Sequence, residues 1–177
     1  MQGRCWILGA DEGQSSDMLP ETVSMGFPLV GDLSRFGCFT GSDDLDTERE
    51  YRRALVEEFR QAYPGVLEAR EHPARRVADP FGLWLFSKKA GPQDLVVVHL
   101  KKGEGRKAVA IAQIVGPYSF VTSSPWPHRL PVIVRSLDQW TLPNPYSGWG
   151  NVFGESVDDS LLMATVEAHI AGCWADR

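Results

Sequence analysis

The amino-acid sequence predicts an α+β protein, a compact mixed β-barrel with flanking helices. Short runs of β-branched and apolar residues occur at 94–100, 107–115 and 130–137, each bounded by glycine, proline or charged residues, and such runs are typical of strands. Two longer segments, 46–63 and 155–172, repeat apolar residues at helical spacing. With 177 residues, 43% of them hydrophobic, the chain can bury one core, so a single domain over residues 1–177 is expected.

The first quarter of the chain is expected to hold two strands and a short helix. Residues 4–9 predict a strand inside a sheet, because Cys5-Trp6-Ile7-Leu8 is apolar throughout. A helix is expected to run to about Ser24, with Ser15, Ser16 or Asp17 as its N-cap. Residues 26–33 predict a short strand and a turn.

A helical insert is expected at about 44–90. The first of its helices begins at Asp46 or Thr47 and ends near Tyr63, before Pro64-Gly65. The second begins at Asp79-Pro80, with the aspartate as cap and the proline at the first position, and ends before Gly91-Pro92.

The insert's first helix is amphipathic, with a strongly charged face. One interpretation is a solvated face with ion pairs inside the helix. The other is a partner-binding or phosphate-facing role for its four arginines, which are Arg49, Arg52, Arg53 and Arg60.

The centre of the barrel is expected to consist of three long strands. Val96 to Val98 lie in the first, residues 107–115 form the second, and 130–137 form the third. Gly116-Pro117 breaks the second strand, because proline removes a ladder donor and glycine admits positive φ. Residues 118–121 alternate as a short strand, 138–149 show no regular period, and the last helix is expected at about 155–172.

This central stretch resembles the EVE-type and related PUA-like domains. The resemblance lies in Asp94-Leu-Val-Val-Val-His-Leu, a basic glycine turn, Ala110-Ile-Ala-Gln-Ile-Val-Gly-Pro-Tyr118 and Pro127-His-Arg-Leu-Pro-Val132, and Gly31-Asp32-Leu33 matches as well. It covers about 5–33 and 81–140 and is closest to the DNA-binding portions of modification-dependent restriction systems. It implies a β-barrel related to the YTH readers that flips a modified base into a pocket.

The resemblance also implies where that pocket lies. An aromatic-lined site is expected at one end of the barrel, in which Asp32 accepts a hydrogen bond from a base amino group. Family members often carry an aromatic residue, commonly tryptophan, after the first loop, where this chain has Met18 or Leu19. Trp84 and Tyr118 each have a structural alternative, packing on the barrel and tying two strands together. The candidate pocket residues are Trp6, Gly9, Phe27, Asp32, Trp84 and Tyr118.

The loop at 122–129 presents Trp126 between two prolines and ahead of two basic residues. An aromatic wedge beside basic residues is what base extrusion requires, because the gap in the stack must be filled and the phosphates held. The alternative is that Trp126 covers the barrel end and Arg129 pairs with an acid. The candidate phosphate and groove residues are Trp126, His128, Arg129, Lys101, Lys102 and Arg106.

No catalytic motif is found, so the protein is not expected to be an enzyme. The sequence has no Gly-x-Ser-x-Gly elbow, phosphate loop or His-Glu-x-x-His pattern. Its three cysteines are widely spaced, which argues against a zinc site and for reduced cytoplasmic thiols. No cofactor or metal is expected, and no apolar run approaches the ~20 residues that span a bilayer.

The predicted function is a nucleic-acid-binding module that reads a modified base, for example a methylated one. DNA is favoured over RNA as the partner, and a separately encoded nuclease or other effector is a further candidate partner. The net charge of −5 is not that of a nonspecific binder, so a local basic stripe is required. The alternatives are a protein-interaction or regulatory subunit, and a hydrolase or transferase that uses His99 or His128.

Overall fold

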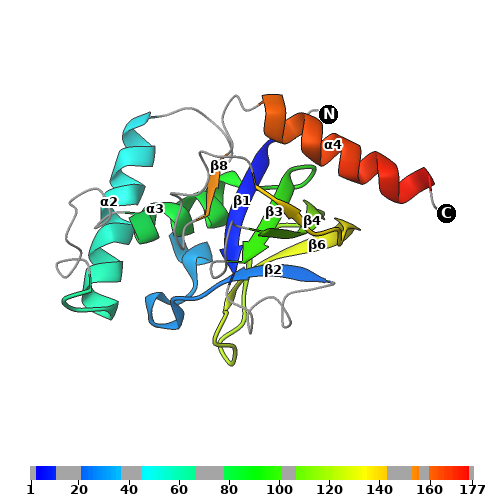
Figure 1. Cartoon of the computed structure of the whole chain (residues 1–177). Coiled ribbons are helices and arrows are strands. Elements are labelled where there is room, and N and C mark those ends of the chain that lie inside the picture. The colour runs from blue at the N-terminus through cyan, green and yellow to red at the C-terminus, as the bar shows by residue number, and fades with distance from the viewer. Residues whose placement is uncertain are drawn as a thin grey trace. The chain divides into compact units, whose positions relative to one another are not determined.

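The protein is α+β, with a curled, half-barrel sheet and three α-helices in the part of the chain described (Figure 1). The computed structural model describes residues 3–10, 21–36, 45–66, 78–100, 107–142, 153–155 and 160–175. The chain separates into two compact units. The first consists of 1–23, 90–117 and 130–177, and the second of 24–89 and 118–129. The expectation of a single domain stays a prediction.

The sheet has the strand order β2-β6-β4-β3-β1-β8, with β7 paired to β4 and β5 paired to β6. Its centre is a parallel pair, β1 and β3, in a register that runs from Cys5–Leu95 to Ala10–Leu100. The neighbours β8 and β4 pair antiparallel with this centre. The strands are β1 (Cys5–Ala10), β2 (Thr22–Met25), β3 (Leu95–Leu100), β4 (Lys107–Ile114), β5 (Ser119–Phe120), β6 (His128–Ser136), β7 (Trp140–Thr141) and β8 (Gly154–Glu155).

In the first unit, the helix α4 (Ser160–Ala175) covers one face of the sheet (Figure 1). Leu162 and Val166 of this helix pack in one cluster with Ile7 of β1, Val97 of β3 and Ile111 of β4, and all five are buried. Nearly every side chain of β1 and β3 is buried, which explains their continuous apolar sequences, since a central strand has no solvent-facing side.

A buried carboxylate fixes the start of β1 against the turn that precedes β3. Asp94 accepts hydrogen bonds from the backbone N–H groups of Arg4 and Gly91 at 2.9 and 3.1 Å, and from the Trp6 indole N–H at 2.8 Å. These three donors satisfy a charge that would otherwise be costly to bury. The Trp6 ring also stacks on Phe153, with ring centroids 5.0 Å apart.

In the second unit, the helices α2 (Leu45–Ala62) and α3 (Ala78–Trp84) pack side by side, and α3 continues into a π-helical turn, η4 (Leu85–Lys89). The buried Phe59 of α2 contacts the rings of Phe27 and Tyr63 at centroid distances of 4.9 and 5.1 Å. Two 3₁₀ turns, η1 (Pro28–Val30) and η2 (Leu33–Phe36), lie between β2 and α2 in the chain.

The structure confirms the predicted helices of the insert, the first strand and the three long strands, with small shifts of their ends. The last helix is described from Ser160 onward, and Gly154–Glu155, where it was expected to begin, is a strand. Within 138–149, the structure adds the short strand β7. No helix in the described residues is long and apolar enough to cross a membrane.

Two expectations for residues 15–33 are wrong where the structure describes them. Residues 22–25 form a strand, because Val23 and Met25 are buried in the sheet and Val132 donates its N–H to Glu21 at 2.9 Å. Residues 26–33 are not a strand, because Phe27 takes a left-handed backbone conformation with φ 69° and Pro28 begins η1. Residues 11–20 lie outside the described part of the chain.

Candidate functional site

Three of the residues predicted for the base pocket or the phosphate contacts meet in the second unit around His128. This residue lies in β6 and is fully buried, not on the loop where it was expected. Its Nδ1 lies 2.7 Å from the Tyr118 hydroxyl, and its Nε2 lies 3.2 Å from the backbone carbonyl of Phe27. The Leu33 N–H donates to the same Tyr118 hydroxyl at 3.4 Å.

These contacts define the protonation state of His128. A carbonyl can only accept, so Nε2 carries the proton and Nδ1 accepts the hydrogen bond from the Tyr118 hydroxyl. Burial lowers the pKa of His128 to about 4, against the weaker raising effects of the Phe27 carbonyl and the Asp32 charge. Burial likewise raises the pKa of Tyr118. A buried, neutral histidine with both nitrogens occupied is a structural link and not an accessible general base.

Phe27 has a strained backbone conformation, which is held by the hydrogen bond between its carbonyl and His128 and by the packing of its ring. Its positive φ of 69° costs a non-glycine residue roughly 1 kcal/mol. The carbonyl bonds His128, and the ring packs edge-on against Phe59 and Tyr63. The Phe27 ring is therefore engaged by α2 and the segment that follows it.

Asp32 is exposed and caps the turn η2. Its two carboxylate oxygens accept from the Ser34 N–H at 2.9 Å and from the Ser34 hydroxyl at 2.7 Å. Partial burial acts to raise the pKa of Asp32, but the Ser34 hydrogen bonds, with smaller contributions from His128 and Lys88, lower it overall. The carboxylate is ionised at neutral pH and retains lone pairs for a further donor.

The loop that carries Trp126 is tied together by its own side chains. Ser124 Oγ accepts from the Trp126 N–H and from the Arg129 guanidinium, both at 3.1 Å, and Arg129 also donates to the Trp126 carbonyl at 3.4 Å. The Trp126 ring lies against Gly26, where an added Cβ would stand 3.4 Å from the indole. The arginine thus braces the loop, and it pairs with no acid among the described residues.

The other described residues that were predicted for the base pocket or the phosphate contacts do not lie around His128. Trp6 and Gly9 belong to β1 in the first unit; Trp6 is fully buried with its N–H on Asp94, and Gly9 pairs with His99 of β3. Lys101, Lys102 and Arg106 lie outside the described residues. Trp84 belongs to the second unit, at the C-terminal end of α3.

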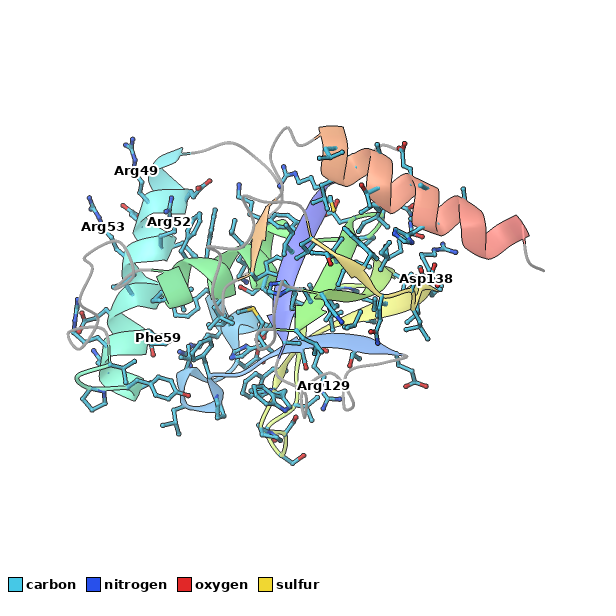
Figure 2. The ribbon with its side chains drawn as sticks, viewed as in Figure 1. Arg49, Arg52, Arg53, Phe59, Arg129 and Asp138 are labelled. Atoms are coloured by element: carbon cyan, nitrogen blue, oxygen red, sulfur yellow. The ribbon has the colours of Figure 1, made fainter. Side chains whose placement is uncertain are left out.

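Trp84 lines a pocket between α2 and α3, here called the α2–α3 pocket, with a cavity volume of about 430 Å³. Its apolar surface comes from one side chain of α2 and three of α3, and three arginines of α2 complete it. Figure 2 shows Arg52 and Arg53, together with Arg49, on the first half of that helix. The lining residues are Val56, Pro80, Phe81, Trp84, Arg52, Arg53 and Arg60.

The rings of Phe81 and Trp84 form a stacked pair, with centroids 5.5 Å apart and planes inclined by 23°. The Arg52 guanidinium lies 4.5 Å from the Phe81 centroid and 5.1 Å from that of Trp84. The Lys89 ammonium lies 5.3 Å from the Trp84 centroid. Cations over ring faces are attracted by the negative π-face, which explains why Arg52 and Lys89 both lie over this aromatic pair.

The acids near the pocket are paired with these cations. Glu48 lies 3.1 Å from the Lys89 ammonium and 3.7 Å from the Arg52 guanidinium, and Glu57 lies 2.6 Å from that of Arg60. Among the described residues, Arg53 has no ion-pair partner and no carboxylate lines the pocket. Among the described residues, the cations at the pocket therefore outnumber the acids that pair with them, although the chain as a whole is acidic.

The sequence predicts Trp84 as a candidate pocket residue and allows a phosphate-facing role for the arginines of α2, but it does not predict that they lie together. The available signal was the spacing on two helices, with Arg52, Val56 and Arg60 at four-residue intervals and Pro80, Phe81 and Trp84 on one side of α3. The packing of these two helix faces against each other is tertiary structure, and the residue spacing within either helix does not predict it.

Comparison of the chain with models of known families, with curated proteins and with solved structures finds no match. In the part of the chain that the structure describes, no three His, Cys, Asp or Glu side chains gather in a possible metal site. The α2–α3 pocket is instead suited to a ligand that combines a flat apolar ring with negative charge.

Proposed function

We propose that the protein is a nucleic-acid-binding module that takes an unstacked base into the α2–α3 pocket, with DNA favoured over RNA. The single observation that carries this proposal is a pocket in which three arginines border a stacked pair of aromatic rings. Stacking of a base on an aromatic side chain is typically worth ~1–3 kcal/mol. Arginine is the side chain best suited to phosphate, because its planar fork donates two parallel hydrogen bonds.

The wider proposal is that the protein is a PUA-like, EVE-related reader of a modified base. A separately encoded nuclease or other effector would be its partner. A curled sheet with three helices is compatible with that family's barrel. The side chains of Phe27 and Tyr118 bond and pack inside the second unit. The base-binding role therefore falls to the part-exposed Phe81 ring and the Arg52 guanidinium, with the buried Trp84 packed beneath them. The apolar wall of Val56 and Pro80 would favour a base that carries a methyl group.

The braced Trp126 loop supports extrusion of the base from a duplex. A side chain that enters a base stack must be held rigidly. The backbone of Trp126 is fixed by two hydrogen bonds, one from its N–H and one to its carbonyl. An apolar side chain that fills the vacated space lowers the cost of unstacking. In this proposal Trp126 is the wedge and Arg129 keeps its loop rigid.

Fluorescence-polarisation titrations of labelled oligonucleotides test the proposal. The set comprises single- and double-stranded DNA and RNA, with and without methylated or hydroxymethylated bases. Binding that weakens about tenfold or more in Arg53→Ala, the loss typical of a charge-assisted contact, supports it. Arg135→Ala is the matched control, because that arginine bonds Gln113 in the first unit. No binding by any oligonucleotide would overturn the proposal in favour of a protein-interaction subunit.

A further inference from the structure

The α2–α3 pocket has two chemically different sides. One side is the stacked pair of Phe81 and Trp84 with the Arg52 guanidinium over it. The other is the exposed stretch of α2 that carries Arg53 and Arg60, seven residues apart and therefore two turns along the same side of the helix. A ligand that fills the cavity touches both sides.

We infer that the α2–α3 pocket accepts one complete nucleotide, with the base against the Arg52, Phe81 and Trp84 side and the phosphate on Arg53 and Arg60. This inference rests on the proposed function and adds to it that the base and its own phosphate are bound in the same cavity. A free nucleoside monophosphate is then a ligand by itself and competes with an oligonucleotide. The cavity volume of about 430 Å³ lies within the roughly 300–1,000 Å³ usual for small-ligand sites.

Arg53 is the principal phosphate ligand in this arrangement. It is exposed on α2, lines the cavity, and has no ion-pair partner among the described residues. Arg60 is bound to Glu57 at 2.6 Å, so part of its charge is already neutralised. A phosphate therefore gains more from Arg53 than from Arg60.

Arg52 has a different role, because its guanidinium lies over both rings. Glu48 approaches it at 3.7 Å and holds Lys89 at 3.1 Å on the same aromatic pair. A guanidinium presents a flat face to a base, whereas an ammonium does not. Arg52→Lys therefore keeps the charge and removes the stacking surface, which separates the two contributions.

Isothermal titration calorimetry of the whole chain tests the inference with deoxynucleoside 5′-monophosphates, the matching nucleosides, inorganic phosphate and O-phosphotyrosine. We expect the monophosphate to bind at least about tenfold more tightly than the nucleoside or phosphate, as one charge-assisted contact implies. Arg53→Ala should lose about tenfold for the monophosphate and leave the nucleoside unchanged. Arg52→Lys should weaken both, and Arg135→Ala neither. Circular dichroism confirms that each variant is folded.

The outcomes separate this inference from the proposed function. If oligonucleotides bind and monophosphates neither bind nor compete, the inference is overturned and the proposed function stands. If monophosphates bind and no oligonucleotide does, the proposed function fails and the pocket is a free-nucleotide site. Binding of O-phosphotyrosine as tight as that of the monophosphate overturns the inference in favour of a phosphorylated protein partner.

Discussion

At the scale of single residues, the buried link between Tyr118, His128 and the Phe27 carbonyl makes the stability of the fold depend on pH. His128 has a pKa of about 4 in the folded protein and about 6.5 when exposed. Between these pH values the unfolded chain binds a proton that the folded chain does not. The stability contributed by neutral His128 is therefore fully present above about pH 6.5, and the free energy of unfolding decreases as the pH falls toward 4.

We expect a loss of up to about 3 kcal/mol over this range, since each pKa unit corresponds to about 1.4 kcal/mol. Urea unfolding at several pH values between 4 and 7 measures it. His128→Gln should be less stable at neutral pH and should show a flatter pH dependence. An unchanged slope in His128→Gln would show that another group titrates.

At the scale of elements, the parallel pair β1 and β3 depends on a close backbone approach where the two strands begin. A Cβ at Gly3 would stand 2.1 Å from the Gln93 carbonyl oxygen, so the backbone would have to shift, whereas a Cβ at Gly91 would meet nothing within 4 Å. Gly3→Ala forces the strand away from the turn and from the Asp94 hydrogen bonds.

Gly3→Ala should destabilise the fold by about 1–3 kcal/mol, the usual cost of overpacking. Gly91→Ala is the matched substitution and should change stability by less than about 1 kcal/mol, with a stabilising sign if only the unfolded chain is affected. The midpoints of urea unfolding compare the two. Equal midpoints would mean that the start of β1 detaches from the turn without a cost to the rest of the sheet.

The elements that could be predicted from the sequence are those whose pattern is local. The apolar run at 95–100 and the helical spacing of Tyr51, Leu55 and Phe59 each imply one kind of element, and both are present. The strand β2 could not be predicted, because four residues form it only through pairing in the sheet. The left-handed conformation of Phe27 likewise depends on the packing of its ring and the bond to its carbonyl.

The candidate site was predicted in part for the same reason. An arginine-rich helix face is visible in the sequence, but solvated and ligand-binding faces have the same spacing. The spacing also cannot show the packing of α3 against α2, which places Phe81 and Trp84 beneath the Arg52 guanidinium. His128 was assigned to the phosphate contacts because the start of β6 was expected two residues later, and inside the strand it is buried.

At the scale of the whole molecule, the net charge of −5 limits how a nucleic acid can be bound. A broadly basic surface neutralises many phosphates, and its affinity falls by orders of magnitude between low and physiological salt. Here three arginines line the α2–α3 pocket, while the chain as a whole carries a net negative charge. The affinity should therefore depend on few phosphates and on stacking, which salt affects little.

We expect a plot of log Kobs against log salt concentration with a slope of about −2 to −3, as two or three neutralised phosphates imply. Arg53→Ala should make this slope less steep by about one, whereas Arg135→Ala should leave it unchanged, because Arg135 is engaged by Gln113. Fluorescence polarisation at four or more salt concentrations measures both. A slope of about −6 or steeper would require a basic surface that extends beyond the α2–α3 pocket. It would also show that phosphate contacts, and not the stacked rings, dominate the affinity.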